Sequence, residues 1–257
     1  MLYNSSTSIF KLTPAGVIEL EILLELPPYS RNRVEKTVSA TNSLLDGYFI
    51  PCAPAGVPMM DCFATGVYVT TKYGSEVYCS LRTRDYTLNH ILEKVKVASE
   101  FGLSGVLVTR GDPPRHGSDC NDYTTEFVVS YIRKHGLRAD LGIVLSTKFT
   151  VEEMVKRVEC VKPDFVTIIR FSGSYVECLR ALARAFSGIK KTFAFILLGL
   201  GSNVELFERL GQPYVLPGEL EAVIERLRGL VTGIILSSPL ELYGVVETVK
   251  RVKRLAL

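Results

Sequence analysis

Two carboxylates in this sequence stand at the ends of apolar runs, each just before a Pro-Pro pair. Glu25 lies near the end of the run at 17–26, and Asp112 follows Arg110-Gly111 after the run at 105–109. Continuous apolar runs of this kind indicate buried strands, and the prolines stop further strand pairing. A cation, a glycine and a carboxylate at the C-terminal end of a buried strand is the usual position of active-site chemistry in α/β proteins.

Each of these charged groups has a functional and a structural interpretation. A carboxylate in an otherwise apolar strand favours function for Glu25, and the alternative is a solvated strand end. For Asp112, the functional interpretation is a carboxylate held near a cofactor by rigid prolines, and the alternative is a turn cap. The planar guanidinium of Arg110 could hold a phosphate or pyrophosphate, or could neutralise a carboxylate, and the same two interpretations apply to Arg170.

The elements that must position these residues alternate between strand and helix patterns along the whole chain. Strands are predicted at 17–26, 48–50, 76–81, 105–109, 139–145, 165–169, 193–198 and 231–236. Helices are predicted at 32–45, 59–71, 87–101, 123–135, 151–161, 175–186, 203–211, 219–230 and 240–255. Because parallel strands need crossover helices, this alternation predicts a parallel sheet. About eight repeats predict an α/β fold in which residues 1–257 form a single (β/α)8 TIM barrel domain. A doubly wound sheet is the alternative, but no GxGxxG follows the first strand.

In such a barrel, functional residues gather at the C-terminal ends of the strands. Those ends carry polar residues: Glu25, Pro51-Cys52, Arg82-Thr83-Arg84-Asp85, Arg110-Gly111-Asp112, Ser146-Thr147-Lys148, Arg170, residues 199–203 and Ser237-Ser238. We therefore expect Glu25 and Asp112 to face one cavity together with several arginines. Arg84 and Asp85 are expected to pair with each other, or Asp85 to cap the helix that follows.

Composition excludes several other classes of protein. With 47% hydrophobic and 22% charged residues, the chain can bury a substantial core. A net charge of +3, without basic runs interleaved with aromatics, gives no indication of nucleic-acid binding. The six cysteines form no CxxC pair and the three histidines have no metal-ligand spacing, so neither a disulfide framework nor a metal site is expected. The absence of a signal peptide and of a membrane-spanning run predicts a cytoplasmic location.

Several stretches together resemble the 5,10-methylenetetrahydrofolate reductases, which are flavoprotein barrels that bind FAD. They are LELPP at 24–28, DGYFIP at 46–51, LRTRD at 81–85, the segment 98–114 that ends in RGDPP, and Asp122-Tyr123. RGDPP alone would be a poor signal, but its combination with LELPP and LRTRD at similar spacing is fairly specific. The resemblance covers about the first half of the chain.

This resemblance implies roles for the matched residues. Glu25 matches the general acid that protonates the folate as the one-carbon bridge opens, and Asp112 matches the carboxylate beside the flavin and pterin rings. The FAD contacts that it implies are Thr83, Arg110, Gly111, Asp112 and Tyr123. Substrate contacts are expected from Glu25, Asp112 and Arg170. The implied partners are a tetrahydrofolate-type one-carbon carrier and NAD(P)H or another electron donor. The chain is expected to act as a homo-oligomer or as a subunit of a one-carbon enzyme complex.

The second half of the chain departs from the family pattern. LSTKF at 145–149 lacks the family's histidine, Arg170 follows the sixth strand where a glutamine is expected, and Ser237-Ser238 replace an arginine. Two further interpretations follow from these departures. One is a non-catalytic or regulatory subunit that keeps the barrel and partners another one-carbon enzyme. The other is an unrelated barrel enzyme that acts on a phosphorylated metabolite, with Arg110 and Arg170 as anion binders.

Overall fold

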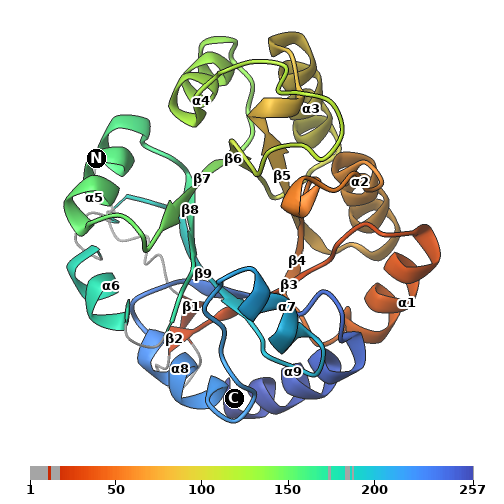
Figure 1. Ribbon diagram of the computed structural model, residues 1–257, viewed down its shortest axis with the longest axis vertical. Helices are drawn as coiled ribbons and strands as arrows, with labels where there is room; N and C mark the ends of the chain where they lie inside the picture. The colour runs from red at the N-terminus through yellow and green to blue at the C-terminus, as the bar shows by residue number, and fades with distance from the viewer. Residues whose placement is uncertain (1–10, 13–17, 173–174, 183–185, 187, 257) are drawn as a thin grey trace, which may run out of the picture.

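The computed structural model describes residues 11–12, 18–172, 175–182, 186 and 188–256, and it contains a closed barrel of eight parallel strands. In order around the barrel the strands are β10 (Gly233–Ser237), β3 (Glu21–Glu25), β4 (Gly47–Ile50), β5 (Glu76–Arg82), β6 (Gly105–Thr109), β7 (Leu141–Ser146), β8 (Phe165–Ile169) and β9 (Lys191–Leu197). Helices surround this barrel on its outer side (Figure 1). The predicted (β/α)8 TIM barrel is thus confirmed.

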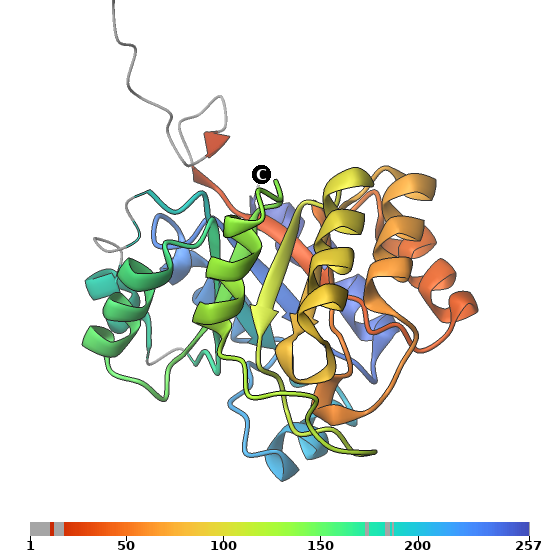
Figure 2. The ribbon, with the colours of Figure 1, turned by 90° about the horizontal axis from the view of Figure 1, so that it is seen from above.

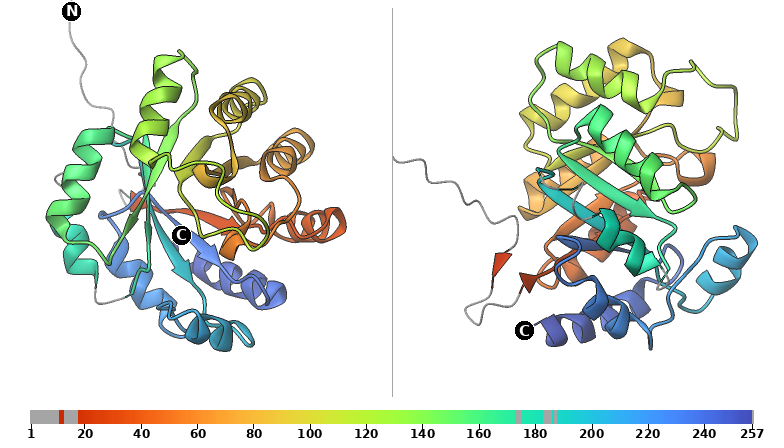
Figure 3. Two further views of the ribbon diagram at one scale, coloured as in Figure 1. Left: turned by 45° about the horizontal axis from the view of Figure 1, so that its top comes forward. Right: turned by 90° about the vertical axis from the view of Figure 1, so that its left-hand side faces the viewer.

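The helices cover the outer face of the sheet along the crossovers between successive strands, except α7, which lies beyond the C-terminal ends of the strands (Figures 1 and 3). Their bounds are α1 (Arg31–Thr41), α2 (Cys62–Tyr73), α3 (Leu88–Glu100), α4 (Thr125–Lys134), α5 (Val151–Val161), α6 (Val176–Leu182), α7 (Asn203–Arg209), α8 (Leu220–Leu227) and α9 (Leu242–Ala256). The apolar faces of the helices bury side chains such as Val95 and Ile132 against the outward-facing residues of the strands. Two 3-10 turns, η1 (Pro54–Gly56) and η2 (Thr83–Asp85), follow β4 and β5 at the C-terminal ends of the strands.

The first predicted strand is divided in the structure. Within 17–26, Ile18–Glu19 form β2, which pairs antiparallel with β1 (Lys11–Leu12) in a separate two-stranded sheet, and only β3 enters the barrel. This small sheet stands apart from the barrel (Figure 2). Residue 17 lies outside the described residues. The run carries Glu19 and Glu21 among its apolar residues without a glycine or proline that would signal a change of partner, so the pattern alone predicted one strand.

Most helices begin or end a few residues away from the predicted bounds, because capping side chains decide where a helix starts. Asp61 caps α2, so this helix begins at Cys62 rather than at 59. Thr87 caps α3 through His90 N, and Thr124 caps α4 through Phe127 N. The predicted cap at Asp85 is therefore wrong, and Thr87 has that role.

Aromatic rings and glycines fill the inside of the barrel together. The Tyr78 ring lies edge-on to Phe165 and to Phe193, with ring centroids 5.3 Å apart in both pairs. Gly105 and Gly142 face this group from neighbouring strands, where an added Cβ would lie 2.7 Å and 2.2 Å from atoms of the Phe165 ring. Without side chains at these glycines, the three rings can pack together inside a narrow barrel.

Substituting Gly142 by Ala is expected to lower the free energy of unfolding by about 1–3 kcal/mol, because the new methyl group overlaps the Phe165 ring in a closely packed interior. Urea unfolding measures this change. Gly218→Ala is the matched control, since an added Cβ there meets no atom within 4 Å. Equal stability of the two variants would show that the ring can move aside freely.

At the N-terminal end of the barrel the interior is charged. Lys191 Nζ lies 2.9 Å from Glu21 and 3.2 Å from Glu76, and it stands 5.6 Å from the centre of the Tyr78 ring. Charged groups at this face of a TIM barrel serve stability, whereas chemistry belongs to the opposite face. A functional site is therefore expected at the C-terminal mouth.

Candidate active site at the barrel mouth

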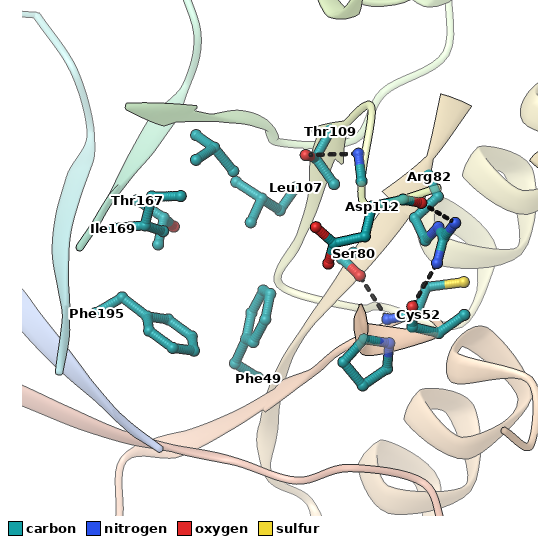
Figure 4. Close-up of a pocket in the computed structure, with 14 residues that line it drawn as sticks. Phe49, Cys52, Ser80, Arg82, Leu107, Thr109, Asp112, Thr167, Ile169 and Phe195 are labelled. Atoms are coloured by element: carbon teal, nitrogen blue, oxygen red, sulfur yellow. Dashed lines mark hydrogen bonds between the residues drawn. The ribbon is translucent and has the colours of Figure 1, made fainter. Parts of the chain in front are cut away.

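A pocket of about 190 Å³ opens at the C-terminal ends of the strands. Its walls are mainly apolar, with a few polar groups and a loop carboxylate (Figure 4). The lining residues are Phe49, Cys52, Ala53, Pro54, Ser80, Arg82, Leu107, Thr109, Gly111, Asp112, Val144, Thr167, Ile169 and Phe195. Apolar walls with a small number of placed polar groups are the usual composition of a ligand site.

Asp112 is the carboxylate that enters this pocket. It follows β6 in an exposed loop, and its side chain points toward the pocket interior (Figure 4). None of the described residues donates a hydrogen bond to this carboxylate, whereas its backbone carbonyl accepts one from Arg82 Nη2 at 2.7 Å. The backbone is thus fixed while the carboxylate is left available for a ligand.

Glu25 lies at the same mouth, at the end of β3. The strand registers place it in one layer with Ser80, Val144 and Phe195, because alternate strands of a barrel contribute the inward-facing residues of each layer. Those three residues line the pocket, although Glu25 itself is not among the lining residues. Glu25 and Asp112 therefore both lie at the C-terminal ends of the strands, but Glu25 does not line the pocket that Asp112 enters, so a cavity shared by both carboxylates stays a prediction.

The environment of Glu25 favours its protonated form. Burial raises the pKa of its carboxyl group to about 7, against the opposing effect of the hydroxyl of Ser237, which donates a hydrogen bond to Oε2. A carboxyl group with a pKa near 7 can both hold and release a proton at neutral pH. Ser237, which ends β10 next to β3, is thus the direct partner of this group.

Arg82 holds the wall of the pocket together. Its side chain is only 2% exposed, and its Nε lies 3.0 Å from Oδ2 of Asp85. One terminal nitrogen donates to the carbonyl of Ala53 and the other to the carbonyl of Asp112. The loops after β4, β5 and β6 are therefore tied by one guanidinium. The predicted Arg84–Asp85 pair is wrong, because Asp85 pairs with Arg82.

The Arg82 side chain also leaves no room for a side chain at position 111, which is a glycine. Its φ of +75° lies in the left-handed region, and an added Cβ would stand 2.9 Å from Arg82 Nε. Gly111 lines the pocket, so its predicted position near a ligand is consistent with the structure. The local backbone, rather than a ligand, is what demands glycine here.

The other predicted cofactor residues hold the long loop after β6. Thr83 is fully buried and donates to the carbonyl of Tyr123 at 3.1 Å. Arg110 pairs with Asp119 at 3.4 Å and with Asp122 at 3.1 Å. None of Thr83, Arg110 and Tyr123 lines the pocket. The structural interpretation of Arg110, neutralising carboxylates, is the one that this arrangement satisfies.

Arg170 also stands away from the pocket. It follows β8 with a φ of +59°, and its Nη2 donates to the carbonyl of Gly211 at 2.6 Å. Its own carbonyl accepts a hydrogen bond from Thr147 at 3.0 Å. Arg170 thus links the loops after β7 and β8 with the end of α7, and it does not join Glu25 and Asp112 at the pocket wall.

Thr167, the most informative polar residue of the wall, was not predicted from the sequence. Its side chain is 1% exposed, it lines the pocket, and its hydroxyl has no hydrogen-bond partner among the described residues. A buried hydroxyl without a partner is costly, so it indicates a hydrogen bond that a ligand would complete. The signal was a lone threonine inside an apolar run, which by itself does not distinguish the inner from the outer face of a strand.

Replacing Thr167 by Val is expected to raise the free energy of unfolding by about 1 kcal/mol, because an unpaired buried hydroxyl is removed at nearly constant shape. Urea unfolding of the ligand-free protein measures this. Thr232→Val is the matched control with the opposite sign, since the Thr232 hydroxyl accepts from Thr192 N at 2.8 Å. A fall in stability for both variants would contradict an unsatisfied Thr167.

These groups suit the flat ring of a flavin better than they suit its diphosphate. The pocket has apolar walls from Phe49, Leu107 and Phe195, and the unpaired Thr167 hydroxyl could meet a polar ring edge. Of the two arginines predicted as anion binders, Arg110 is already paired with carboxylates and Arg170 donates to the carbonyl of Gly211. Among the described residues, no group of three or more His, Cys, Asp or Glu side chains could hold a metal ion.

Comparisons with known proteins support the barrel fold and identify neither a family nor a function. No family model and no curated protein matches the chain. Of solved structures, 554 chains match. One is a cube-shaped, highly porous protein cage designed by fusing symmetric oligomeric domains. It is 14% identical with a TM-score of 0.56, and the match covers 92% of this chain and 73% of that chain. A likeness at this identity concerns the barrel fold alone.

None of the helices among the described residues is both long enough and apolar enough to cross a bilayer.

Proposed function

We propose that this protein is an FAD-dependent reductase that converts 5,10-methylene-tetrahydrofolate, or a related tetrahydropterin, to the 5-methyl form. The observation that carries the proposal is the Glu25 carboxyl group, which is buried at the barrel mouth with a pKa raised to about 7. Opening a one-carbon bridge requires a proton on the leaving nitrogen. A protonated carboxyl group in an apolar site is suited to donate it.

Asp112 complements this acid. Its carboxylate points into the pocket without a partner from the described residues, so an ionised Asp112 would stabilise the cationic iminium of the opened substrate. The apolar walls strengthen this interaction because they exclude water. Glu25 and Asp112 thus have different environments and separable roles, one as proton donor and one as fixed negative charge.

The flavin would supply hydride transfer. Thr167 and Gly111 line the pocket and would contact its ring, and Phe49 would pack against it. Arg110 would have to exchange Asp119 or Asp122 for a phosphate if it is to hold the diphosphate. NAD(P)H or another donor as reductant, a cytoplasmic location and assembly into a homo-oligomer or a one-carbon enzyme complex belong to the same proposal.

A second candidate function is a non-catalytic or regulatory subunit that partners another one-carbon enzyme. Two observations favour it. Arg110 is already satisfied by two aspartates, and the pocket of about 190 Å³ is below the roughly 300–1,000 Å³ of typical ligand sites. In this case Glu25 would keep its raised pKa but would not donate a proton to a substrate.

The absorbance spectrum of the purified protein, before and after incubation with FAD, separates the two candidates. The reductase is expected to show a flavin band that a reductant bleaches and that the methylene-tetrahydropterin restores. A colourless protein that does not retain added FAD would overturn the reductase proposal. Co-purification of such a protein with another one-carbon enzyme would support the subunit.

A further inference from the structure

Three cysteines meet behind the pocket wall, where β4, β5 and α2 come together. Cys52 follows β4, Cys62 is the first residue of α2, and Cys79 lies on the outer face of β5. Cys62 Sγ donates to the carbonyl of Ser80 at 3.3 Å, and Cys79 Sγ donates to the carbonyl of Cys62 at 3.4 Å. All three are free thiols, and only Cys52 is partly exposed.

Cys52 has the features of a reactive thiol. Its sulfur lies 3.8 Å from the hydroxyl of Tyr86 and points away from the centre of the pocket (Figure 4). A hydrogen bond with Cys62 is the largest cause that holds the pKa of Cys52 below its usual value. Tyr86 and the guanidinium of Arg82 act in the same direction, whereas burial and Asp85 oppose them. The thiolate, which is the nucleophilic form, is therefore favoured at Cys52.

Cys62 is the complementary partner. The same hydrogen bond, together with burial, raises its pKa well above the usual value, so the proton stays on Cys62. This S–H can point to the Ser80 carbonyl, or to Cys52 when that sulfur is a thiolate. A partly exposed cysteine with a lowered pKa beside a buried thiol is the arrangement of an attacking cysteine and its resolving cysteine.

We propose that Cys52 and Cys62 form a dithiol that hydroperoxides oxidise to a disulfide. The Cys52 thiolate attacks one peroxide oxygen, the O–O bond breaks, and the leaving hydroxide takes a proton to become water. Cys52 is then a sulfenic acid, oxidised by two electrons, while the peroxide is reduced by two. The Cys62 sulfur attacks the Cys52 sulfur, and its proton leaves with the displaced hydroxide as a second water. Two thiols and one hydrogen peroxide thus give one disulfide and two waters.

The disulfide would act on the candidate site through the pocket wall. Cys52 N donates to Ser80 Oγ at 2.6 Å, and the carbonyl of the next residue, Ala53, accepts from Arg82. Ser80 and Arg82 both line the pocket. A bond from Cys52 to the start of α2 shifts this segment, so oxidation changes the shape of the wall. The dithiol itself does not depend on a flavin or a folate.

Peptide mass spectrometry of the reduced full-length protein after brief hydrogen peroxide treatment and thiol alkylation tests the proposal. A Cys52–Cys62 disulfide that dithiothreitol reverses is expected. Loss of free Cys52 should be several-fold faster than loss of the exposed Cys160, because the surroundings of Cys52 favour its thiolate. A disulfide between other cysteines, or oxidation of Cys52 no faster than that of Cys160, would overturn the proposal.

Variants show which cysteine attacks the peroxide and which one then forms the disulfide. Cys52→Ser should form no disulfide, whereas the matched control Cys160→Ser should behave as the wild type. Cys62→Ser should accumulate a Cys52 sulfenic acid that dimedone traps. Its absence from a folded Cys62→Ser protein would refute the order of attack. Because Cys62 is buried and its variant could fail to fold, the mapping on the wild-type protein decides the proposal by itself.

Discussion

Replacing Glu25 by Gln is expected to lower the rate of pterin reduction by about 10²- to 10⁴-fold, the usual contribution of a general acid, while flavin reduction by the electron donor is unchanged. Glutamine keeps the size of the side chain and can still accept the hydrogen bond from Ser237. It cannot release a proton to the substrate. Only the half-reaction that needs a proton on the leaving nitrogen should therefore fail.

Stopped-flow measurement of the two half-reactions separates these effects. Glu21→Gln is the matched control, because Glu21 lies on the same strand at the opposite end of the barrel and pairs with Lys191. It should leave both half-reactions intact at temperatures where the protein is folded. An equal loss of both half-reactions in Glu25→Gln would refute the role of Glu25 as acid.

The raised pKa of Glu25 also makes the rate and the stability depend on pH. The acid form is the active form, so the wild-type rate of pterin reduction should fall as pH rises through about 7. A carboxyl group with a folded pKa above its unfolded value contributes stability at low pH that is lost as pH rises through the folded pKa. Glu25→Gln should therefore unfold at a higher temperature than the wild type at pH 9 and at the same temperature at pH 4. At pH 9 the free energy of unfolding of Glu25→Gln should exceed that of the wild type by on the order of 1–3 kcal/mol.

The fold could be predicted from the sequence because it depends on repeated local patterns. Apolar runs such as 105–109 and 165–169 match β6 and β8 in full, and strand–helix alternation leaves few arrangements other than a barrel. The positions of Glu25 and Asp112 followed from the same rule, since both stand where a strand ends. Because these patterns depend on many residues, a change in one side chain does not alter the predicted fold.

The partners of the charged residues could not be predicted in this way. Arg82, Arg84 and Arg110 all lie in stretches that resemble the reductase family. Arg84 and Arg110 nevertheless pair with Asp119 and Asp122, which lie in a polar loop without periodicity. Which arginine turns inward depends on the register of β5, where a shift of one residue exchanges the two faces of the strand. For the same reason the free hydroxyl of Thr167 is visible only in the folded barrel.

Replacing Arg82 by Met is expected to lower the free energy of unfolding by about 3–5 kcal/mol, the usual cost of breaking a buried ion pair from one side. Methionine fills a similar volume but donates no hydrogen bond. Asp85 would lose its cation, and the carbonyls of Ala53 and Asp112 would lose their donors. Because those carbonyls belong to the loops on either side of the pocket, Asp112 should lose its fixed position as well.

Urea unfolding and ligand binding test the two consequences of this change together. Arg180→Met is the matched control, because Arg180 pairs with Glu177 at the surface, where an ion pair contributes only about 0–1 kcal/mol. Arg82→Lys should keep the positive charge but not the forked contacts, so its stability should lie between those of the wild type and Arg82→Met. If Arg82→Met were as stable as Arg180→Met, the three loops would hold their positions without the guanidinium. The pocket wall would then be set by the backbone alone.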